Sequence, residues 1–379
     1  MTKIIKQGVS TTCSIFGFRI FLFSFLLLAS NYGFAQSKIV RVLICKSDTS
    51  LTLSSQGPVV IKAGGKILKR EKRLEEIVLK RKSNAVRFGR GEYKTLDFIS
   101  KGLPISVNNI AYRGDIRISV HQKQLFVVNY VDIESYLKGV VPSEMFSTWP
   151  MEALKAQAVV ARTYALYHIA GPSKEYDLCS EAKSQMYKGV CSESSNSNMA
   201  VYLTEKMCLY DNKKLVPTYF HSTCGGNTIN ADSIWEKALD SIEGVDCKFC
   251  KDSPHYKWKK SIGRRKLGKI LSKKGFKIGK IKKIRLEKGK PYRIFIEDKY
   301  GELQVLNVAK FRMLVGSEIV RSSNFRVKVG WFRVKFKGNG WGHCVGLCQW
   351  GAHGMALKGY SCEQILQRYY PNLDLKKMF

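Results

Sequence analysis

The sequence predicts an α+β protein that is rich in strands, with one long buried helix and a short C-terminal helix. Short runs of alternating or β-branched residues, separated by Gly, Pro, Asn and Asp, fill the first third of the chain. One alanine-rich segment, Pro150 to His168, has the composition of a helix. A last amphipathic segment, Cys362 to Tyr370, follows Ser361 and Gln364, which are spaced as a capping box.

The first residues have the pattern of an export signal. Positive residues precede an apolar run, Ile20 to Ala29, and Gly33-Phe34-Ala35 offers the small residues that a signal peptidase recognises. The apolar run is short for a membrane span. We therefore expect residues 1–35 to be a signal peptide and the protein to be exported, to the periplasm or to the cell wall and extracellular space. A retained N-terminal anchor is the alternative.

The expected strands divide the rest of the chain. We expect an N-terminal β-rich part at 36–120, a main region at 121–379, and within it a basic β-rich segment at about 257–330. The clearest strands are Ile39 to Ile44, Val59 to Ile61, Ile116 to Val120, Leu125 to Val131, Tyr136 to Val141, Met199 to Leu203, Val216 to His221 and Phe332 to Phe336.

The expected long helix is apolar around most of its circumference. Ser147 and Thr148 precede it as capping residues, and alanines dominate its body. A helix of this kind packs closely and is expected to be buried. Gly171-Pro172 would end it. Glu144 then falls in a short loop between the strand at 136–141 and this helix.

The net charge of +34 favours a polyanionic partner, which is nucleic acid, an anionic membrane surface or an acidic wall polymer. Export argues against nucleic acid. Much of the excess positive charge lies between Lys257 and Lys290, where cations alternate with apolar residues. A solvated basic face is the favoured interpretation of this run, and a dedicated binding site is the alternative.

Glu144 is a candidate general acid. Its apolar neighbours Val141, Met145 and Trp149 should raise its pKa, as a general acid at neutral pH requires. An ordinary surface carboxylate is the alternative. On the following helix Lys155 and Arg162 share a face, and an arginine within an apolar helix should meet a carboxylate or a substrate anion.

Two further segments combine polar side chains with glycines. Phe220 to Gly226 ends a strand with an imidazole, hydroxyls and a thiol side by side. Gly338 to Ala352 surrounds His343 with five glycines and two tryptophans, Trp341 and Trp350. Glycines allow another chain to approach the backbone, and indoles form platforms for sugar rings. Structural packing is an equally good explanation of either segment alone.

Together these segments resemble the stage II sporulation protein D family (SpoIID/LytB). The resemblance covers nearly all of the chain after the leader, in the family's order. The segments that carry it are Val140 to Met145, Ala153 to Ala165, His221 to Gly226 and Gly340 to Ala352, with shorter ones at Tyr112 to Gly114, Val128 to Asn129, Glu134 to Leu137 and Ile365 to Pro371.

The resemblance implies a lytic transglycosylase that cleaves peptidoglycan glycan strands and prefers strands without stem peptides. Such an enzyme is expected to require no cofactor. The family's catalytic glutamate corresponds to Glu144, which would act alone, without the second carboxylate of most glycosidases. The expected substrate-binding residues are Lys155, Arg162, Tyr164, His221, Ser222, Trp341, His343, Gln349 and Trp350.

The cysteines depart from the family's pattern. Family members with zinc have Asp-Leu-Cys followed by His-Cys-Gln, whereas here Asp177-Leu178-Cys179 is followed by Lys183-Ser184-Gln185, so two ligands are missing. Ten cysteines remain after the leader, and disulfides are the default for an exported chain. Cys179 and Cys191 are a candidate pair. A second set, Cys224, Cys247, Cys250 and Cys348, would form either two disulfides or a structural zinc site.

Two other functions compete with glycan cleavage. Some relatives are described as amidase enhancers, so a non-catalytic wall-binding activator of an N-acetylmuramoyl-L-alanine amidase is the main alternative, and its charge suits an acidic wall. A thiol hydrolase that uses Cys224 or Cys344 with His221 or His343 is the third hypothesis. It is disfavoured because a nucleophilic thiol must stay reduced.

Overall fold

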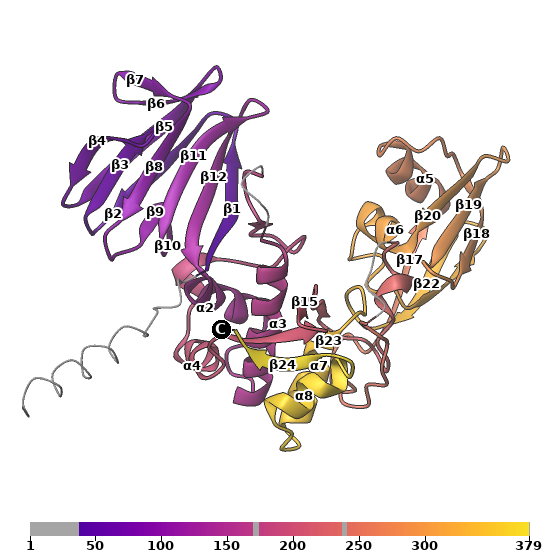
Figure 1. The fold of residues 1–379 in the computed structure, drawn as a ribbon. Coiled ribbons are helices and arrows are strands. Elements are labelled where there is room, and N and C mark those ends of the chain that lie inside the picture. Colours follow the sequence, from indigo (N-terminus) through magenta and orange to yellow (C-terminus); the bar gives the residue numbers. More distant parts are fainter. Residues whose placement is uncertain (1–37, 170–173, 237–240, 379) are drawn as a thin grey trace, which may run out of the picture. The chain divides into compact units, whose positions relative to one another are not determined.

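The computed structural model describes residues 38–169, 174–236 and 241–378. The predicted signal peptide at 1–35 and the predicted helix end at Gly171-Pro172 lie outside these residues. Strands outnumber helices along the chain, and the α+β class is confirmed (Figure 1). The described residues form seven α-helices, whereas the sequence predicted one long helix and one short C-terminal helix. The prediction therefore contained too few helices.

Two antiparallel sheets make up the N-terminal part. One has the order β13-β1-β12-β11-β8-β3-β4, and only its β1–β13 pair is parallel. Its strands are β1 (Ile39–Ser47), β3 (Val59–Ala63), β4 (Lys66–Glu71), β8 (Thr95–Ser100), β11 (Asp115–His121), β12 (Gln124–Asp132) and β13 (Leu178–Cys179). The other, in the order β10-β9-β2-β5-β6-β7, consists of β2 (Ser50–Ser55), β5 (Leu74–Lys82), β6 (Ala85–Phe88), β7 (Gly91–Tyr93), β9 (Ile105–Val107) and β10 (Ile110–Tyr112).

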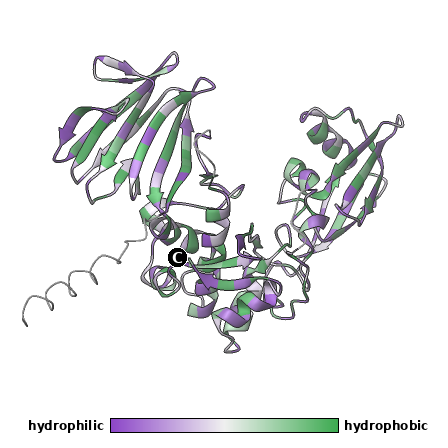
Figure 2. Cartoon of the chain, in the orientation of Figure 1, coloured by the Kyte–Doolittle hydropathy of each residue, from purple (hydrophilic) through white to green (hydrophobic). Residues whose placement is uncertain are grey.

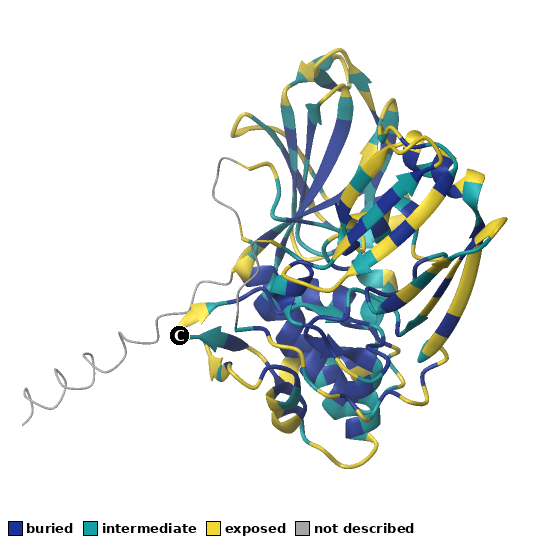
Figure 3. Ribbon diagram, turned by 90° about the vertical axis from the view of Figure 1, so that its right-hand side faces the viewer, coloured by how far each residue is buried: buried dark blue, intermediate teal, exposed yellow. Residues whose placement is uncertain are grey.

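These sheets follow from the alternation in the sequence. Hydrophobic residues alternate with polar ones along many of the strands (Figure 2), and buried residues alternate with more exposed ones in β2 and β8 (Figure 3), as expected for sheets with one face on a core. Val40 and Val42 of β1 share a single hydrophobic core with Leu51 and Leu53 of β2. Residue 120, where we placed a division, lies within β11, which pairs with β12 along its whole length.

The segment before the long helix is itself a helix, α2 (Ile133–Glu144), so the strand predicted at 136–141 was wrong. Asp132 caps it by accepting hydrogen bonds from the backbone N–H groups of Glu134 and Ser135. Its buried side chains, Ile133, Tyr136, Leu137, Val140 and Val141, follow a helical spacing of three and four residues. The β-branched Val140 and Val141 favour a strand locally, but the spacing of the whole set is that of a helix.

Helix α3 (Met151–Tyr167) is the longest helix of the described chain, and 12 of its 17 residues are buried. Pro150 occupies its N-cap position without a side-chain hydrogen bond, so the capping role expected of Ser147 and Thr148 was wrong. Its small side chains allow close packing against α2, α4 (Ser195–Leu203), α7 (Gln349–Ala356) and α8 (Cys362–Tyr369). The strand predicted at 199–203 was also wrong, because Ser194 caps α4 there.

A second hydrophobic core lies within the basic segment. Its buried residues include Trp258, Leu267, Phe311 and Phe336. They come from two three-stranded sheets, β17-β22-β21 and β18-β19-β20, and from two helices. The elements are β17 (Lys257–Gly263), α5 (Arg264–Ser272), β18 (Ile281–Glu287), β19 (Arg293–Asp298), β20 (Leu303–Asn307), α6 (Val308–Val315), β21 (Phe325–Val329) and β22 (Arg333–Asn339).

A short parallel pair joins two distant parts of the sequence. In it β16 (Phe220–His221) lies beside β23 (Leu347–Cys348), which leads directly into α7. The predicted capping box of Ser361 and Gln364 begins α8. The remaining elements are β14 (Met207–Asp211), β15 (Lys214–Leu215), β24 (Asp374–Lys377) and the 3-10 helices η1 (Gly189–Ser192) and η2 (Ala231–Ser233). None of the described helices has the length and apolar character of a membrane span.

Candidate active site

Glu144 is the last residue of α2, where the chain turns into an extended conformation at Met145. Its Oε1 accepts a hydrogen bond of 2.6 Å from the backbone N–H of Met186. The Met186 segment is fixed in turn by the fully buried Gln185, which accepts a hydrogen bond from the Tyr136 hydroxyl (3.2 Å) and donates one to the Ala161 carbonyl (3.3 Å). The carboxyl is therefore held in a set position by α2, α3 and the 185–187 segment.

The surroundings of Glu144 favour its protonated form. Burial raises its pKa from 4.5 to about 7, and the Met186 N–H group and the charge of Lys188 offset only part of this shift. Burial also raises the pKa of Tyr136 and Tyr164, and the charge of Glu144 adds to both shifts, which places the two phenols near the carboxyl. The raised pKa expected from the sequence is confirmed in direction.

The shifted pKa has a consequence for stability. Because the folded-state pKa lies above the ordinary value, the stabilising contribution of the protonated group is complete below about pH 4.5 and is lost as the pH rises through about 7. A glutamine cannot ionise, and Glu144→Gln should keep that contribution. We expect the melting temperature of Glu144→Gln, relative to that of the wild type, to rise as the pH increases from about 5 to about 8. Calorimetry measures both melting temperatures. A difference that does not change with pH would contradict the assigned pKa.

Two histidines lie side by side where β16 meets the glycine-rich segment. The rings of His221 and His343 are 5.4 Å apart. Gly342, at φ +120°, allows this approach, since a Cβ there would lie 2.6 Å from the Cβ of His221. The Val345 carbonyl lies 3.0 Å from Nδ1 of His221, and the Val345 N–H donates to Nδ1 of His343 (3.1 Å). One residue therefore orients both rings.

Both histidines are neutral. Burial lowers the pKa of His221 to about 4 and that of His343 well below its ordinary value. Because a carbonyl only accepts, Nδ1 of His221 carries its proton and Nε2 keeps a lone pair. This buried Nε2 has no hydrogen-bond partner among the described residues. The pair can exchange hydrogen bonds with a neutral ligand but offers no cation to an acidic one.

Aromatic rings link the histidines to the neighbourhood of Glu144. Tyr164 lies 6.2 Å from Tyr219, which lies 6.0 Å from His343 (ring centroids). Tyr219 also stacks on Trp235 at 4.3 Å. Our sequence reasoning missed Tyr136, Tyr219 and Trp235. For Tyr219 a signal was available, since it directly precedes the Phe220-His221 segment.

Ser222, Gln349 and Trp350 lie together, as the pairing of β16 and β23 requires. The backbone N–H of Trp350 donates to the Ser222 carbonyl (3.0 Å), and the Trp350 ring lies 5.2 Å from that of Trp149. The buried Gln349 amide donates to Gln157 of α3 (3.4 Å). Trp341 pairs through its backbone with Thr223, and its ring lies 4.4 Å from that of His255.

Two expected substrate contacts have partners within the protein. Arg162 is fully buried and forms a bidentate ion pair with Glu134 (2.8 and 2.7 Å), in addition to hydrogen bonds to the Met207 and Val201 carbonyls. It meets a carboxylate, which is one of the two partners that we predicted. Lys155 pairs with Glu152 (2.9 Å) on the same helix.

The cysteine predictions had mixed outcomes. Cys179 and Cys191 do not pair: the first lies against the Ser184 hydroxyl (3.3 Å) and the second donates to the Lys188 carbonyl (3.0 Å). Burial raises the pKa of Cys344 to about 12, which argues against a thiol nucleophile there. The sulfurs of the second set, Cys224, Cys247, Cys250 and Cys348, all lie within 4.8 Å of one another.

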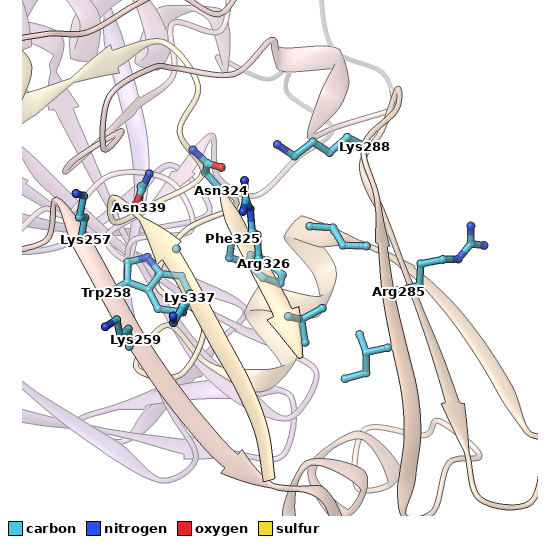
Figure 4. A pocket seen from close by; sticks show the side chains of 14 residues that line it. Lys257, Trp258, Lys259, Arg285, Lys288, Asn324, Phe325, Arg326, Lys337 and Asn339 are labelled. Carbon is cyan, nitrogen blue, oxygen red and sulfur yellow. The ribbon is translucent and has the colours of Figure 1, made fainter. Parts of the chain in front are cut away.

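A basic groove of about 1020 Å³ lies between the two small sheets of the second core (Figure 4). Lys259, Lys337 and Arg326 stand directly opposite one another on β17, β22 and β21, which forms a row of three cations. Like charges in this arrangement destabilise a sheet. The other labelled residues around the groove are Lys257, Trp258, Arg285, Lys288, Asn324, Phe325 and Asn339.

Comparison with known proteins places the chain in a family. The SpoIID signature (Stage II sporulation protein) matches residues 121–210. An uncharacterized protein of Brachyspira hyodysenteriae is 30% identical over 355 residues, which cover 91% of this chain and 95% of that protein. Stage II sporulation protein D of Bacillus subtilis is 26% identical over 283 residues (69% of this chain, 79% of that protein). The amidase enhancer of Bacillus subtilis is 25% identical over 290 residues, covering 63% of this chain and 40% of the enhancer.

This chain belongs to the SpoIID/LytB family, as the resemblance of its motifs predicted. Family membership supports a role related to the cell wall. The signature at 121–210 contains α2, α3 and the 185–187 segment, and so includes Glu144 with the groups that hold it.

Proposed function

We propose that this protein is a lytic transglycosylase that cleaves the bond between N-acetylmuramic acid and N-acetylglucosamine in peptidoglycan strands without stem peptides. The observation that carries the proposal is the state of Glu144. Its carboxyl is held by one backbone hydrogen bond and has a pKa of about 7, so a large fraction is protonated near neutral pH. This is the property that a general acid needs.

In the proposed reaction Glu144 donates its proton to the glycosidic oxygen. The bond between that oxygen and the anomeric carbon of N-acetylmuramic acid breaks, and its electron pair stays with the departing N-acetylglucosamine. The 6-hydroxyl of the same muramic acid then bonds to the anomeric carbon, and its proton returns to the Glu144 carboxylate. The product ends in a 1,6-anhydro ring, and no water is consumed. A second carboxylate to position water is therefore not needed.

The other residues would bind the sugars. The partly exposed rings of Tyr164, Trp341 and Trp350 offer faces for apolar contact with sugar rings. The neutral His221 and His343 suit hydroxyl and acetamido groups, which carry no charge. The substrate lies outside the cytoplasmic membrane, and the proposal therefore includes export by residues 1–35.

The test is digestion of purified denuded glycan strands by the purified protein. We expect soluble fragments that end in 1,6-anhydro-N-acetylmuramic acid, identified by mass spectrometry. Tight binding to the strands without release of fragments would overturn the proposal and favour the second candidate function.

The second candidate is a wall-binding protein that activates an amidase. The basic groove favours it, because its row of three cations, Lys259, Lys337 and Arg326, forms no ion pair among the described residues. An acidic wall polymer would neutralise this row. The name of the amidase enhancer from Bacillus subtilis is in line with this function.

Neutralising the groove should weaken binding to acidic walls. With each cation near an anionic surface contributing about 1 kcal/mol, the double variant Arg326→Gln/Lys337→Gln should bind at least about tenfold more weakly, and salt should weaken the wild type more than the variant. Sedimentation with purified walls measures this. A matched control is Lys66→Gln/Lys80→Gln, which removes two exposed cations of the N-terminal sheets. Equal losses in the two double variants would show that only net charge matters.

A further inference from the structure

We propose that Cys224, Cys247, Cys250 and Cys348 together bind one structural zinc ion. The four residues come from three separate segments: the chain after β16, the Cys247-Lys248-Phe249-Cys250 segment, and the residue at the N-cap of α7. All four are buried, and their sulfurs lie within 4.8 Å of one another. They form the sole group of three or more candidate metal ligands in the described part of the chain. The inference does not depend on the proposed function.

The spacing of the sulfurs fits a tetrahedral metal site. Zinc–thiolate bonds are about 2.3 Å long, so the sulfurs of a tetrahedral site lie about 3.8 Å apart. The Cys224 and Cys250 sulfurs are 3.6 Å apart. A disulfide would bring two sulfurs to about 2 Å and separate the four into two pairs. Mutual proximity of all four therefore favours zinc over the two disulfides that the sequence left open.

The surrounding donors are those of a metal–thiolate site. The Cys348 sulfur accepts hydrogen bonds from the backbone N–H groups of Cys224 (3.2 Å) and Gly351 (3.3 Å). The Tyr369 hydroxyl lies 3.1 Å from the Cys247 sulfur. Hydrogen-bond donors directed at sulfur stabilise thiolates, and such contacts orient the ligands of a bound metal.

Close packing around the cluster indicates a structural role. A Cβ at Gly351 would lie 2.8 Å from the Cys247 sulfur, so α7 can approach the cluster only with a glycine there. With four protein ligands a tetrahedral zinc has no free position for water or substrate, as in structural sites. The ion would clamp β16 to the beginning of α7 and thereby hold the segment that carries His221 beside the one that carries His343.

This placement also accounts for the departure from the family's zinc pattern. At the usual position Lys183-Ser184-Gln185 supplies no histidine or cysteine, and Cys179 contacts a serine hydroxyl. There the 185–187 segment is held by hydrogen bonds to α2 and α3. In this chain the zinc ion would instead link the segment that follows His221 to the segment that contains Cys348.

The decisive experiment measures metal and thiols in the protein purified without chelators. We expect about one zinc per chain by mass spectrometry of the metal. After denaturation with a chelator and no reductant, all four cysteines should be alkylated. A mercurial reagent should release the zinc from the native protein, as followed with a chromogenic chelator. Protein without zinc, or peptides with Cys224, Cys247, Cys250 or Cys348 in disulfides, would overturn the proposal.

Variants then assign the ligands. Cys250→Ser should lose most of the zinc, whereas Cys208→Ser, at a buried cysteine outside the cluster, should retain it. Retention of full zinc by Cys250→Ser would contradict the assignment. If Cys250→Ser does not fold, the metal and thiol measurements on the wild type still decide the question. None of these measurements depends on glycan cleavage, so failure of one proposal is distinguishable from failure of the other.

Discussion

Replacing Glu144 by glutamine should slow glycan cleavage by about 10²- to 10⁴-fold, the usual contribution of a general acid. The amide has the shape of the carboxyl and can still accept the hydrogen bond from Met186, so the variant should keep its fold and its affinity for glycan. It has no proton of suitable acidity to donate to the glycosidic oxygen. The rate of fragment release from denuded strands, with circular dichroism as the check on folding, measures the effect.

Two further measurements separate chemistry from structure. Glu152→Gln, which changes a carboxylate of α3 that pairs with Lys155, is the matched control and should remain within about twofold of the wild type. In the wild type, kcat/KM should fall as the pH rises through about 7, since the protonated acid is the active form. If Glu144→Gln cleaved glycan at the wild-type rate, Glu144 would not be the general acid.

Replacing Arg162 by methionine should destabilise the fold by about 3–5 kcal/mol, the range for breaking a buried ion pair by removing one partner. The change leaves the Glu134 carboxylate without its bidentate partner and removes the donors to the Met207 and Val201 carbonyls. Arg162 lies between α2, α3, α4 and β14, so the loss affects the packing that places Glu144. Urea unfolding measures the free energy.

Lys155→Met on the same helix is the control for Arg162→Met. Its pair with Glu152 is partly exposed, and pairs of that kind contribute about 1 kcal/mol or less. Adding Glu134→Gln to Arg162→Met should recover part of the stability, because the amide leaves no unpaired charge. A destabilisation no larger than that of Lys155→Met would show that Arg162 has no structural role of this size.

The sequence predicted the strands better than the helices. Alternation in β11 is visible because one face of the strand is buried. β12 has buried residues on both faces, and its signal is a continuous apolar, β-branched run. In the segment 136–141 the β-branched Val140 and Val141 favour a strand locally, but the segment is helical. The decisive signal was the capping residue Asp132 followed by apolar residues at helical spacing. Here the longer-range pattern prevails over the local propensity.

Parts of the site depend on contacts that no local pattern contains. The parallel pairing of His221 with Cys348 joins residues more than a hundred positions apart, and the backbone hydrogen bond to Glu144 comes from Met186. The resemblance to the family identified both segments but not their geometry. For Arg162, a cation in an apolar helix, the sequence left a carboxylate and a substrate anion open as partners. The sequence does not indicate that Glu134, a helix away, neutralises it.

The cysteines illustrate what spacing alone leaves open. Cys247 and Cys250 are separated as metal ligands often are. Cys224 and Cys348 are brought together by the pairing of β16 with β23, and the 247–250 segment joins them through the Asn227–Asp246 bridge. An oxidising compartment made disulfides the default, and the mutual distances of the four sulfurs now favour a metal.

In the proposed reaction Glu144 promotes cleavage without water, and digestion of denuded glycan in oxygen-18-labelled water distinguishes this reaction from hydrolysis. If the muramic acid 6-hydroxyl attacks its own anomeric carbon, the fragments end in 1,6-anhydro rings and contain no label. Hydrolysis instead places one labelled oxygen at each new reducing end. We predict unlabelled anhydro ends for the wild type and their loss in Glu144→Gln. Labelled reducing ends formed by the wild type would show that the enzyme hydrolyses the bond.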